Sequence, residues 1–234
     1  MEKLYEGKSK IVYAGPDEWT CYLKYKDTAT AGNGAKKEDL PDKGRINAKI
    51  SNIIYDYLSK YGIKTHMLRV VEPTMILARK AEIVPLEVVV RNVAAGHFSS
   101  RYGIEEGSPL KNIVVEYSFK NDDLGDPLIT DSMITALGIA EQAELDKIKE
   151  QALKINELLI GFFDKVGIRL IDFKLEFGRC DGDIILCDEI SPDCARLWDK
   201  ATNEKMDKDR FRRDMGDVMY YYEEILRRVM KANE

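Results

Sequence analysis

The stretch LIDFKLEFG, Leu170 to Gly178, alternates between apolar and polar residues along its whole length. Successive side chains of a β-strand point to opposite faces, so the pattern predicts one strand with an apolar face and a charged face. The apolar face carries Ile171, Phe173, Leu175 and Phe177. The charged face carries Asp172, Lys174 and Glu176. Such a charged face is either the solvated side of a sheet or a site that holds a ligand.

A turn signal and a second short strand follow this segment. The tripeptide Asp181-Gly182-Asp183 is typical of a turn, and apolar residues alternate again in DIILCDEI, 183–190. A two-residue loop would place Glu176 opposite Cys187, whereas a three-residue loop would place Glu176 opposite Asp188. The three-residue loop also keeps the apolar faces of both strands together, and we therefore expect that register.

Opposed carboxylates at Glu176 and Asp188 would have a specific use. Residues directly opposite each other lie about 5 Å apart at Cβ, so two carboxylates there repel each other. A divalent cation converts this repulsion into attraction, and Mg²⁺ beside a nucleotide is commonly held by two carboxylates. The alternative is a solvated face on which Lys174 reduces the repulsion, and spacing alone leaves both open.

Length and composition are those of an ordinary globular protein. The chain has 234 residues, 44% of them hydrophobic, which suffices for one large domain or two modest lobes. Its formal net charge of −5 argues against a general nucleic-acid partner. We find no signal-peptide-like segment and no apolar run of about 18 residues, so we expect a cytoplasmic protein without a membrane partner. The four cysteines lack CxxC spacing, and we expect reduced, packed thiols rather than zinc ligands.

The order of predicted elements indicates an α+β fold with antiparallel sheets, because strands outnumber regular βαβ units. Helical spacing of apolar residues predicts helices over 45–61, 141–166 and 209–230. Strand patterns cover 10–15, 19–25 and 113–119, and 65–93 reads as three strands broken at Pro73 and Pro85. The polar, glycine-rich segment 29–44 is expected to be a loop. A boundary at Val84–Pro85 would divide a small β-rich lobe, 1–84, from a larger lobe, 85–234.

Two glycine- and lysine-containing segments could meet phosphates, although neither fits a standard motif. EGKSK, 6–10, fails the P-loop pattern, and GNGAKK, 32–37, fails GxGxxG because its last position is Lys37. A glycine turn between strands could still cover a triphosphate, as the glycine-rich loop of a kinase does. The other kinase motifs are missing, since Asp172-Phe173 is followed by lysine and no HRD occurs. A kinase and a non-catalytic nucleotide-binding module therefore stay as alternatives.

Isolated charged residues at strand ends are further candidates. Arg91, in VVVRNVAAGHF (88–98), could hold a phosphate or carboxylate with both arms of its guanidinium. Each such arginine taken alone could equally be a solvated surface residue. His66 and His97 are the only histidines, and no Ser-His-Asp arrangement is visible.

Five segments together resemble the SAICAR synthetase (phosphoribosylaminoimidazole-succinocarboxamide synthase) family, in order and spacing over essentially the whole chain. They are GKSKIVY (7–13), VPLEVVVRNVAAG (84–96), LIDFKLEFG (170–178), DEISPDCARLWD (188–199) and KMDKDRFRRD (205–214). The resemblance implies an ATP- and Mg²⁺-dependent ligase of de novo purine biosynthesis. Such a ligase joins L-aspartate to the carboxylate of carboxyaminoimidazole ribonucleotide (CAIR) through an acyl phosphate, giving SAICAR, ADP and phosphate. It also implies a homodimer whose subunits bind ATP between a small β-rich lobe and an ATP-grasp-like lobe.

The resemblance also implies roles for individual residues. For the nucleotide, Lys8 and Lys10 are implied to contact the phosphates of ATP. The backbone of Glu82, Ile83 and Val84 is implied to contact the adenine. Glu176 and Asp188 are implied to bind the Mg²⁺. Lys174 is implied to lie near the γ-phosphate and the reacting carboxylate, with Asp172 and Arg196 as its catalytic companions. The implied contacts to CAIR and aspartate are Arg91, His97, Asp193, Arg196, Asp209 and Arg212. His97 stands where some members have serine, and Asn33, where others have aspartate, receives no charge role.

Overall fold

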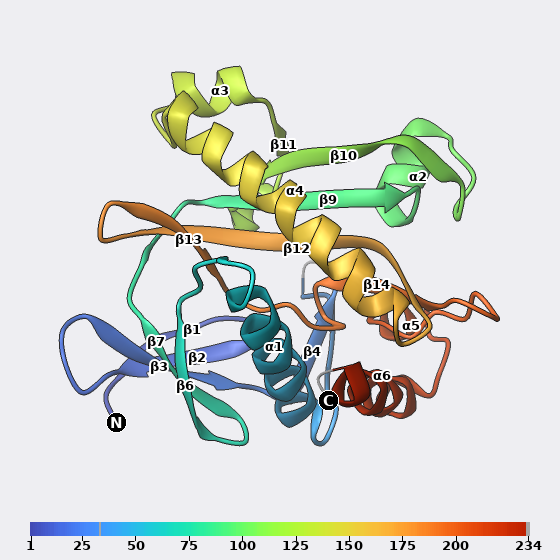
Figure 1. Cartoon of the computed structure of the whole chain (residues 1–234), viewed down its shortest axis with the longest axis horizontal. Helices are drawn as coiled ribbons and strands as arrows, with labels where there is room; N and C mark the ends of the chain where they lie inside the picture. The colour runs from blue at the N-terminus through green and yellow to red at the C-terminus, as the bar shows by residue number, and fades with distance from the viewer. Residues whose placement is uncertain (33, 233–234) are drawn as a thin grey trace.

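The computed structural model describes residues 1–32 and 34–232, so Asn33 lies outside the described residues. Two antiparallel sheets and a small two-stranded sheet are flanked by helices (Figure 1), which confirms the predicted α+β class. The four cysteines are free, as expected. None of the helices within the described ranges combines the length and apolar character needed to cross a bilayer.

The N-terminal sheet has five strands in the order β1-β2-β3-β7-β6. These are β1 (Lys3–Glu6), β2 (Lys10–Ala14), β3 (Thr20–Tyr25), β7 (Met75–Arg79) and β6 (Met67–Glu72). Helix α1 (Lys43–Ser59) packs against the sheet, where Ala48 joins buried residues of β3 and β7 such as Leu23 and Ile76.

The second sheet has seven strands, and its long central strand β12 contains the segment LIDFKLEFG. The order β11-β10-β9-β12-β13 is extended by β14 and β8, which both pair with β12. The bounds are β8 (Glu82–Ile83), β9 (Leu86–Val93), β10 (Pro109–Phe119), β11 (Leu128–Ile129), β12 (Ile168–Cys180), β13 (Asp183–Cys187) and β14 (Ala195–Asp199). Helix α4 (Gln142–Asp164) crosses one face of this sheet (Figure 1) and buries apolar residues such as Leu159 and Phe162 in the core.

Five further elements connect or cover the sheets. They are the short strands β4 (Thr28–Ala31) and β5 (Lys36–Asp39), the helices α2 (Gly96–Tyr102) and α3 (Asp131–Ala136), and a 3₁₀ turn at Asp122–Leu124. The segment 29–44 was expected to be a loop, but it contains the β4–β5 hairpin and the start of α1. Its few apolar residues concealed these strands, which are held by backbone pairing rather than by a buried face.

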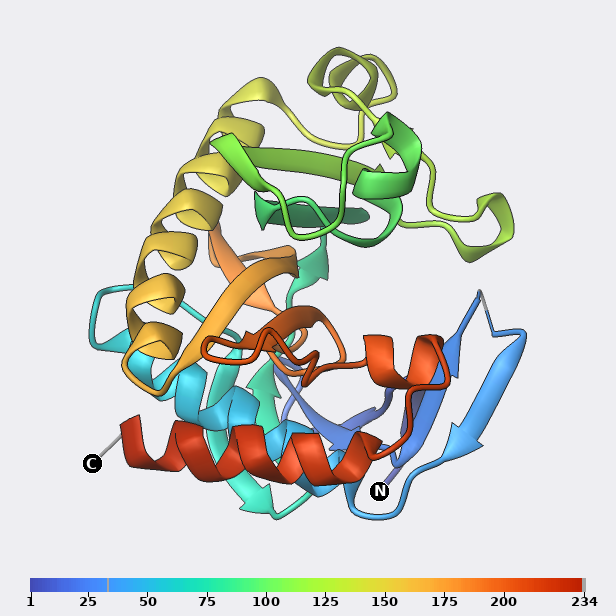
Figure 2. The ribbon, with the colours of Figure 1, turned by 90° about the vertical axis from the view of Figure 1, so that its right-hand side faces the viewer.

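The prediction of one continuous helix over 209–230 is wrong. The structure has α5 (Asp209–Arg212), then a break, then α6 (Val218–Ala232), which runs beside α1 (Figure 2). Asp214, Gly216 and Asp217 all have positive φ angles in the break. Residues in that conformation cannot continue a right-handed helix, although the apolar spacing runs on across them.

The expected three-residue hairpin loop is also wrong. Strand β12 pairs with β13 so that Glu176 lies opposite Cys187 and Cys180 opposite Asp183, which leaves a two-residue turn at Asp181–Gly182. Both turn residues have positive φ, as a type I′ turn requires. The expected register required a strand with one solvated face, but β12 is buried on both faces over most of its length, so alternation could not fix the register.

The chain changes sheets between Arg79 and Glu82. Residues of α1 such as Ile50 and Ile54 nevertheless belong to the same buried cluster as Phe162 of α4. The lobe boundary at Val84–Pro85 stays a prediction.

Gly178 on β12 allows an unusually close approach of the chain that links the two sheets. A Cβ added at Gly178 would lie 2.7 Å from Cβ of Ala81 and 3.1 Å from Sγ of Cys187. We predict that Gly178→Ala lowers the free energy of unfolding by about 1–3 kcal/mol, because Ala81 cannot swing away as a long side chain could. Urea unfolding would measure the change.

Gly161→Ala on α4 is the matched control, since an added Cβ there meets nothing within 4 Å. That change should stabilise the helix by roughly 0.5–1 kcal/mol. Equal stability of the two variants would contradict the close approach at Gly178.

Candidate active site

A cavity of about 490 Å³ lies between the N-terminal sheet and β12. Val12 and Leu23 contribute apolar wall from the first sheet, and Ile83 and Cys187 from the second. Its polar lining consists mainly of lysines and carboxylates, namely Lys8, Lys10, Lys80, Glu87, Lys120, Asp122, Asp126, Lys174, Glu176 and Asp188. A space with apolar walls and a concentrated set of cations fits a ligand with a flat apolar part and an anionic tail.

Lys174 is the centre of a cluster of ion pairs in this cavity. Its Nζ lies 2.7 Å from Oε1 of Glu176, 2.9 Å from Oε1 of Glu87 and 4.0 Å from Oδ2 of Asp188. Lys120 pairs with the other oxygen of Glu176. Glu176 and Asp188 are thus brought to one ammonium group although they are not opposed in the hairpin.

Asp188 reaches this cluster because the strand ends before it. Strand β13 stops at Cys187, and Asp188 has a φ of 62°, which takes its side chain out of the alternation of the strand. Lys10 of β2 holds it from the opposite sheet, with Nζ 2.7 Å from Oδ1 of Asp188 and a second ion pair to Glu189.

Asp188 and Lys174 are held in their charged forms by their neighbours in the cluster. Burial alone would raise the pKa of Asp188, but the attraction of Lys10 and Lys174 outweighs it and lowers that pKa. Burial alone would likewise lower the pKa of Lys174, yet Glu176 and Asp188 raise it. Ionised carboxylates are the ligands that Mg²⁺ prefers, so Glu176 and Asp188 fit a divalent cation. Within residues 1–32 and 34–232 no larger cluster of ligating side chains exists, so ligand oxygens and water would complete the coordination.

A second cavity, of about 340 Å³, adjoins the first and shares Lys8, Glu87 and Lys174 with it. Its other charged lining residues are Arg91, Asp172, Asp193, Arg196, Lys208 and Arg212. Cations outnumber carboxylates there, so this space fits a ligand with several anionic groups.

Asp172 organises the arginines of the second cavity. In the sheet it lies opposite both Arg91 on β9 and Arg196 on β14. Its Oδ2 is 2.7 Å from Nη1 of Arg91 and 3.0 Å from Nη1 of Arg196. Arg91 also binds Glu116, and Nε of Arg196 lies 2.9 Å from Oδ2 of Asp209. Each guanidinium is therefore fixed by carboxylates on neighbouring elements.

Gly96 gives Arg196 the room that it needs. A Cβ at Gly96 would lie 2.1 Å from Nη2 of Arg196, and its φ of +54° also favours glycine. The next residue, His97, is exposed on α2. Its contact with a phosphate stays a prediction.

Asp193 lies at this cavity but is engaged by other parts of the protein. Its Oδ2 is 2.7 Å from Nζ of Lys43, and its Oδ1 accepts a hydrogen bond of 2.7 Å from the hydroxyl of Tyr222. Nζ of Lys208 is 3.9 Å from the same carboxylate. Burial lowers the pKa of Lys208, although Asp193 opposes that effect. Asp193 thus joins α1 and α6 to the loop before β14.

The other residues that were predicted to contact the nucleotide do not all line the first cavity. Ile83 lines the first cavity, whereas the carboxylate of Glu82 pairs with Arg179. The N–H of Val84 donates to the carbonyl of Phe177 at 2.9 Å. Lys8 lines both cavities and donates to Asp122.

Sequence reasoning missed several charged residues that line the cavities, among them Lys80, Glu87, Lys120 and Lys208. It also missed Lys43, which holds Asp193. Glu87 carried a usable signal, because it is a lone carboxylate at the start of the apolar strand LEVVV. Lys120 and Lys208 stand in ordinary polar surroundings, and only the fold brings them to the cavities. The surroundings of Lys43 in the sequence are equally ordinary, and only the fold buries it against Asp193.

Comparisons with known proteins identify the family of the chain. The profile of the SAICAR synthetase family matches residues 3–229. The phosphoribosylaminoimidazole-succinocarboxamide synthase of Finegoldia magna is 51% identical over 230 residues, covering 98% of this chain and 99% of its own. The solved structure of the enzyme of that name from Ehrlichia chaffeensis has a TM-score of 0.96 at 42% identity, covering 97% of this chain and 98% of its own.

A further solved structure, a SAICAR synthetase (Type-2) in complex with ADP, has a TM-score of 0.93 at 45% identity. It covers 96% of each chain. On these similarities the chain belongs to the SAICAR synthetase family and is, as its motifs predicted, a ligase.

Proposed function

We propose that the protein joins L-aspartate to the carboxylate of CAIR at the expense of ATP, giving SAICAR, ADP and phosphate. The observation that carries this proposal is the shared wall of the two cavities, where Lys174 lines both. A phosphoryl group that passes from one substrate to another needs such a point of contact between their sites.

The first cavity is proposed to bind ATP. Its apolar walls would take the base beside Ile83, and Lys8 and Lys10 would face the phosphates. The ADP complex of a relative 45% identical to this chain supports the choice of nucleotide. Glu176 and Asp188 would hold Mg²⁺, which when bound supplies charge neutralisation and orientation for the phosphates.

The second cavity is proposed to bind CAIR and aspartate. Both are multiply anionic, and Arg91, Arg196 and Arg212 offer guanidinium groups suited to phosphate and carboxylate. Asp172 and Asp209 would keep these arginines in place before substrates arrive. Asp193, whose two oxygens are engaged by Lys43 and Tyr222, would act by positioning Lys208 rather than by touching substrate.

The proposed chemistry has two steps. The carboxylate of CAIR first attacks the γ-phosphorus of ATP, forming an acyl phosphate and releasing ADP, because a free carboxylate is a poor acyl donor. The amino group of aspartate then attacks the acyl carbon, the bond to phosphate breaks, and the amine loses a proton as the amide forms. Lys174 would neutralise charge on the transferred group in the first step and on the leaving phosphate in the second.

We further propose that the chain acts as a cytoplasmic homodimer and that residues 1–84 form the lobe that covers ATP. Both statements follow the expectations drawn from the family motifs.

The proposal predicts that phosphate release depends on both co-substrates. Purified protein with ATP and Mg²⁺ should release phosphate rapidly only when CAIR and L-aspartate are both present. A coupled phosphate assay, with omission of each component in turn, measures this. Rapid turnover without aspartate that yields a stable phosphorylated product would instead identify a kinase.

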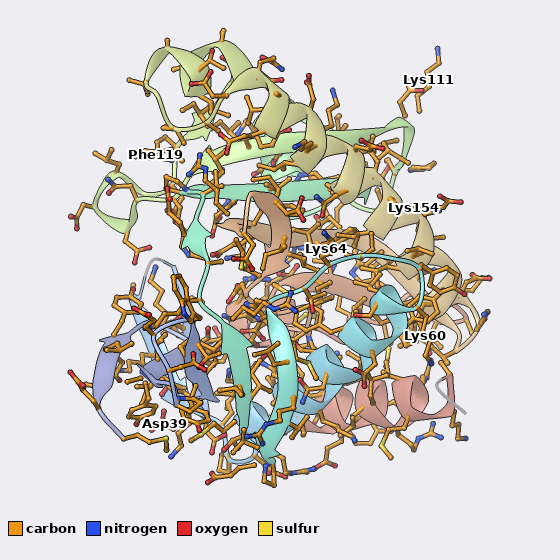
Figure 3. All side chains as sticks on the ribbon, turned by 60° about the vertical axis from the view of Figure 1, so that its left-hand side comes forward. Asp39, Lys60, Lys64, Lys111, Phe119 and Lys154 are labelled. Atoms are coloured by element: carbon orange, nitrogen blue, oxygen red, sulfur yellow. The ribbon has the colours of Figure 1, made fainter. Side chains whose placement is uncertain are left out.

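Lys174→Met is predicted to reduce kcat by about 100-fold or more, because a preorganised cation at the transferred group is lost. Lys154→Met is the matched control, since Lys154 is about half exposed on α4 and its side chain points outward (Figure 3). Steady-state kinetics should show wild-type rates for the control. Comparable rates for both variants would refute the role of Lys174.

Glu176→Gln and Asp188→Asn should each lower the rate at limiting Mg²⁺, because each removes a charged ligand of the proposed metal site. The loss should be at least roughly 10- to 100-fold, which is the effect typical of a damaged metal site. The Mg²⁺ concentration for half-maximal rate should rise in both. Glu157→Gln is the control, because it makes the same carboxylate-to-amide change at an exposed position on α4. It should leave the dependence of the rate on Mg²⁺ concentration unchanged. An unaltered Mg²⁺ requirement in the two site variants would remove them as metal ligands.

A further inference from the structure

His66 is a buried polar side chain that the proposed reaction does not use. It lines the first cavity and is only 4% exposed. Its Nε2 is enclosed, yet within the described residues it has no hydrogen-bond partner. A buried polar atom without a partner is unfavourable for folding, so its presence in a cavity wall points to a ligand.

The position of His66 is fixed from both sheets. The backbone N–H of His66 donates to the carbonyl of Leu186 at 2.9 Å, and the backbone carbonyl of His66 accepts from the backbone N–H of Arg79 at 2.7 Å. The ring also meets Tyr55 edge to face, with centroids 5.7 Å apart. The imidazole is therefore held in place before any ligand binds, which lowers the entropic cost of a contact.

His66 is uncharged at neutral pH. Burial lowers its pKa and the nearby Lys10 acts in the same direction, whereas Asp188 opposes them, and the resulting pKa is about 4. A neutral imidazole offers one donor and one acceptor. It is therefore suited to a neutral polar group rather than to a phosphate, for which the same cavity has Lys8, Lys10 and Lys120.

The surroundings of His66 fit a nucleobase. Arg79 is the last residue of β7, directly before the linker Lys80–Ala81, and Leu186 directly precedes Cys187. Ala81 and Cys187 both lie close to Gly178 and both line the cavity. Together with Cys21 and Ile83 they contribute apolar wall to the cavity that the imidazole of His66 also lines.

We propose that His66 is a specificity-determining residue that reads the base of the bound nucleotide, by a hydrogen bond to the edge of adenine formed by its 6-amino group and N7. This inference rests on the nucleotide site of the proposed function, but not on the ligase reaction. A base that lacks the bonded group would leave the buried nitrogen without a partner and bind more weakly.

The test compares ADP with two analogues, purine riboside diphosphate, which lacks the 6-amino group, and 7-deaza-ADP, which lacks N7. Binding to the wild-type protein and to His66→Leu is measured by calorimetry. Wild type should bind one of the analogues about fivefold to tenfold more weakly than ADP, as expected for one hydrogen bond. His66→Leu should bind ADP more weakly by a similar factor and should no longer distinguish the three ligands.

Two further variants separate recognition from packing. His66→Gln retains a hydrogen-bonding amide and should recover much of the discrimination, whereas Tyr55→Phe, which removes a hydroxyl from the ring beside His66, should bind all three ligands as wild type does. Equal affinity of wild type for the three ligands would overturn the proposal, even if His66→Leu failed to fold. So would unchanged discrimination in a folded His66→Leu. Failure of wild type to bind ADP at all would refute the nucleotide site itself and with it the proposed function.

Discussion

The charge balance along β12 is the interaction on which the rest of the structure depends. Asp172 neutralises Arg91 and Arg196, and two residues further along Lys174 is neutralised by Glu176 and Glu87. These groups are mostly withdrawn from water, and a buried charge that lost its partner would be strongly destabilising. The strand is therefore a rigid base for side chains that must be charged to act, and its pairing with β9, β13 and β14 brings their partners to it.

The position of the site follows from where this strand lies. Its apolar residues Phe173, Leu175 and Phe177 are packed in the main core, while its charged residues line the two cavities. Lys174 can serve both cavities because they meet at its ammonium group. The N-terminal sheet contributes Lys10 to the same cavity, so the ion pairs of Lys10 with Asp188 and Glu189 also join the two sheets.

The sequence was sufficient where one physical effect dominated. Apolar periodicity located α1 and α4 within a few residues, since each buries a single continuous face. It failed for the hairpin at Asp181–Gly182, because a strand buried on both faces gives no contrast between registers. It also failed between α5 and α6, where apolar spacing continues through a break formed by Asp214 and Gly216. The meeting of Arg91, Asp172 and Arg196 depends on strands distant in sequence, and local patterns contain no information on their alignment.

The contacts of Asp193 have a consequence for how the protein is made. Lys43 is almost fully buried near the beginning of the chain, and its partner Asp193 is in turn held by Tyr222 on the last helix. A ribosome-bound chain can complete this arrangement only after Tyr222 has emerged, long after Lys43. Until Asp193 is available, Lys43 cannot be buried with its charge balanced, so a product that ends before Asp193 would not assemble the wall that contains Lys208. Formation of the second cavity thus depends on segments that are synthesised long after α1.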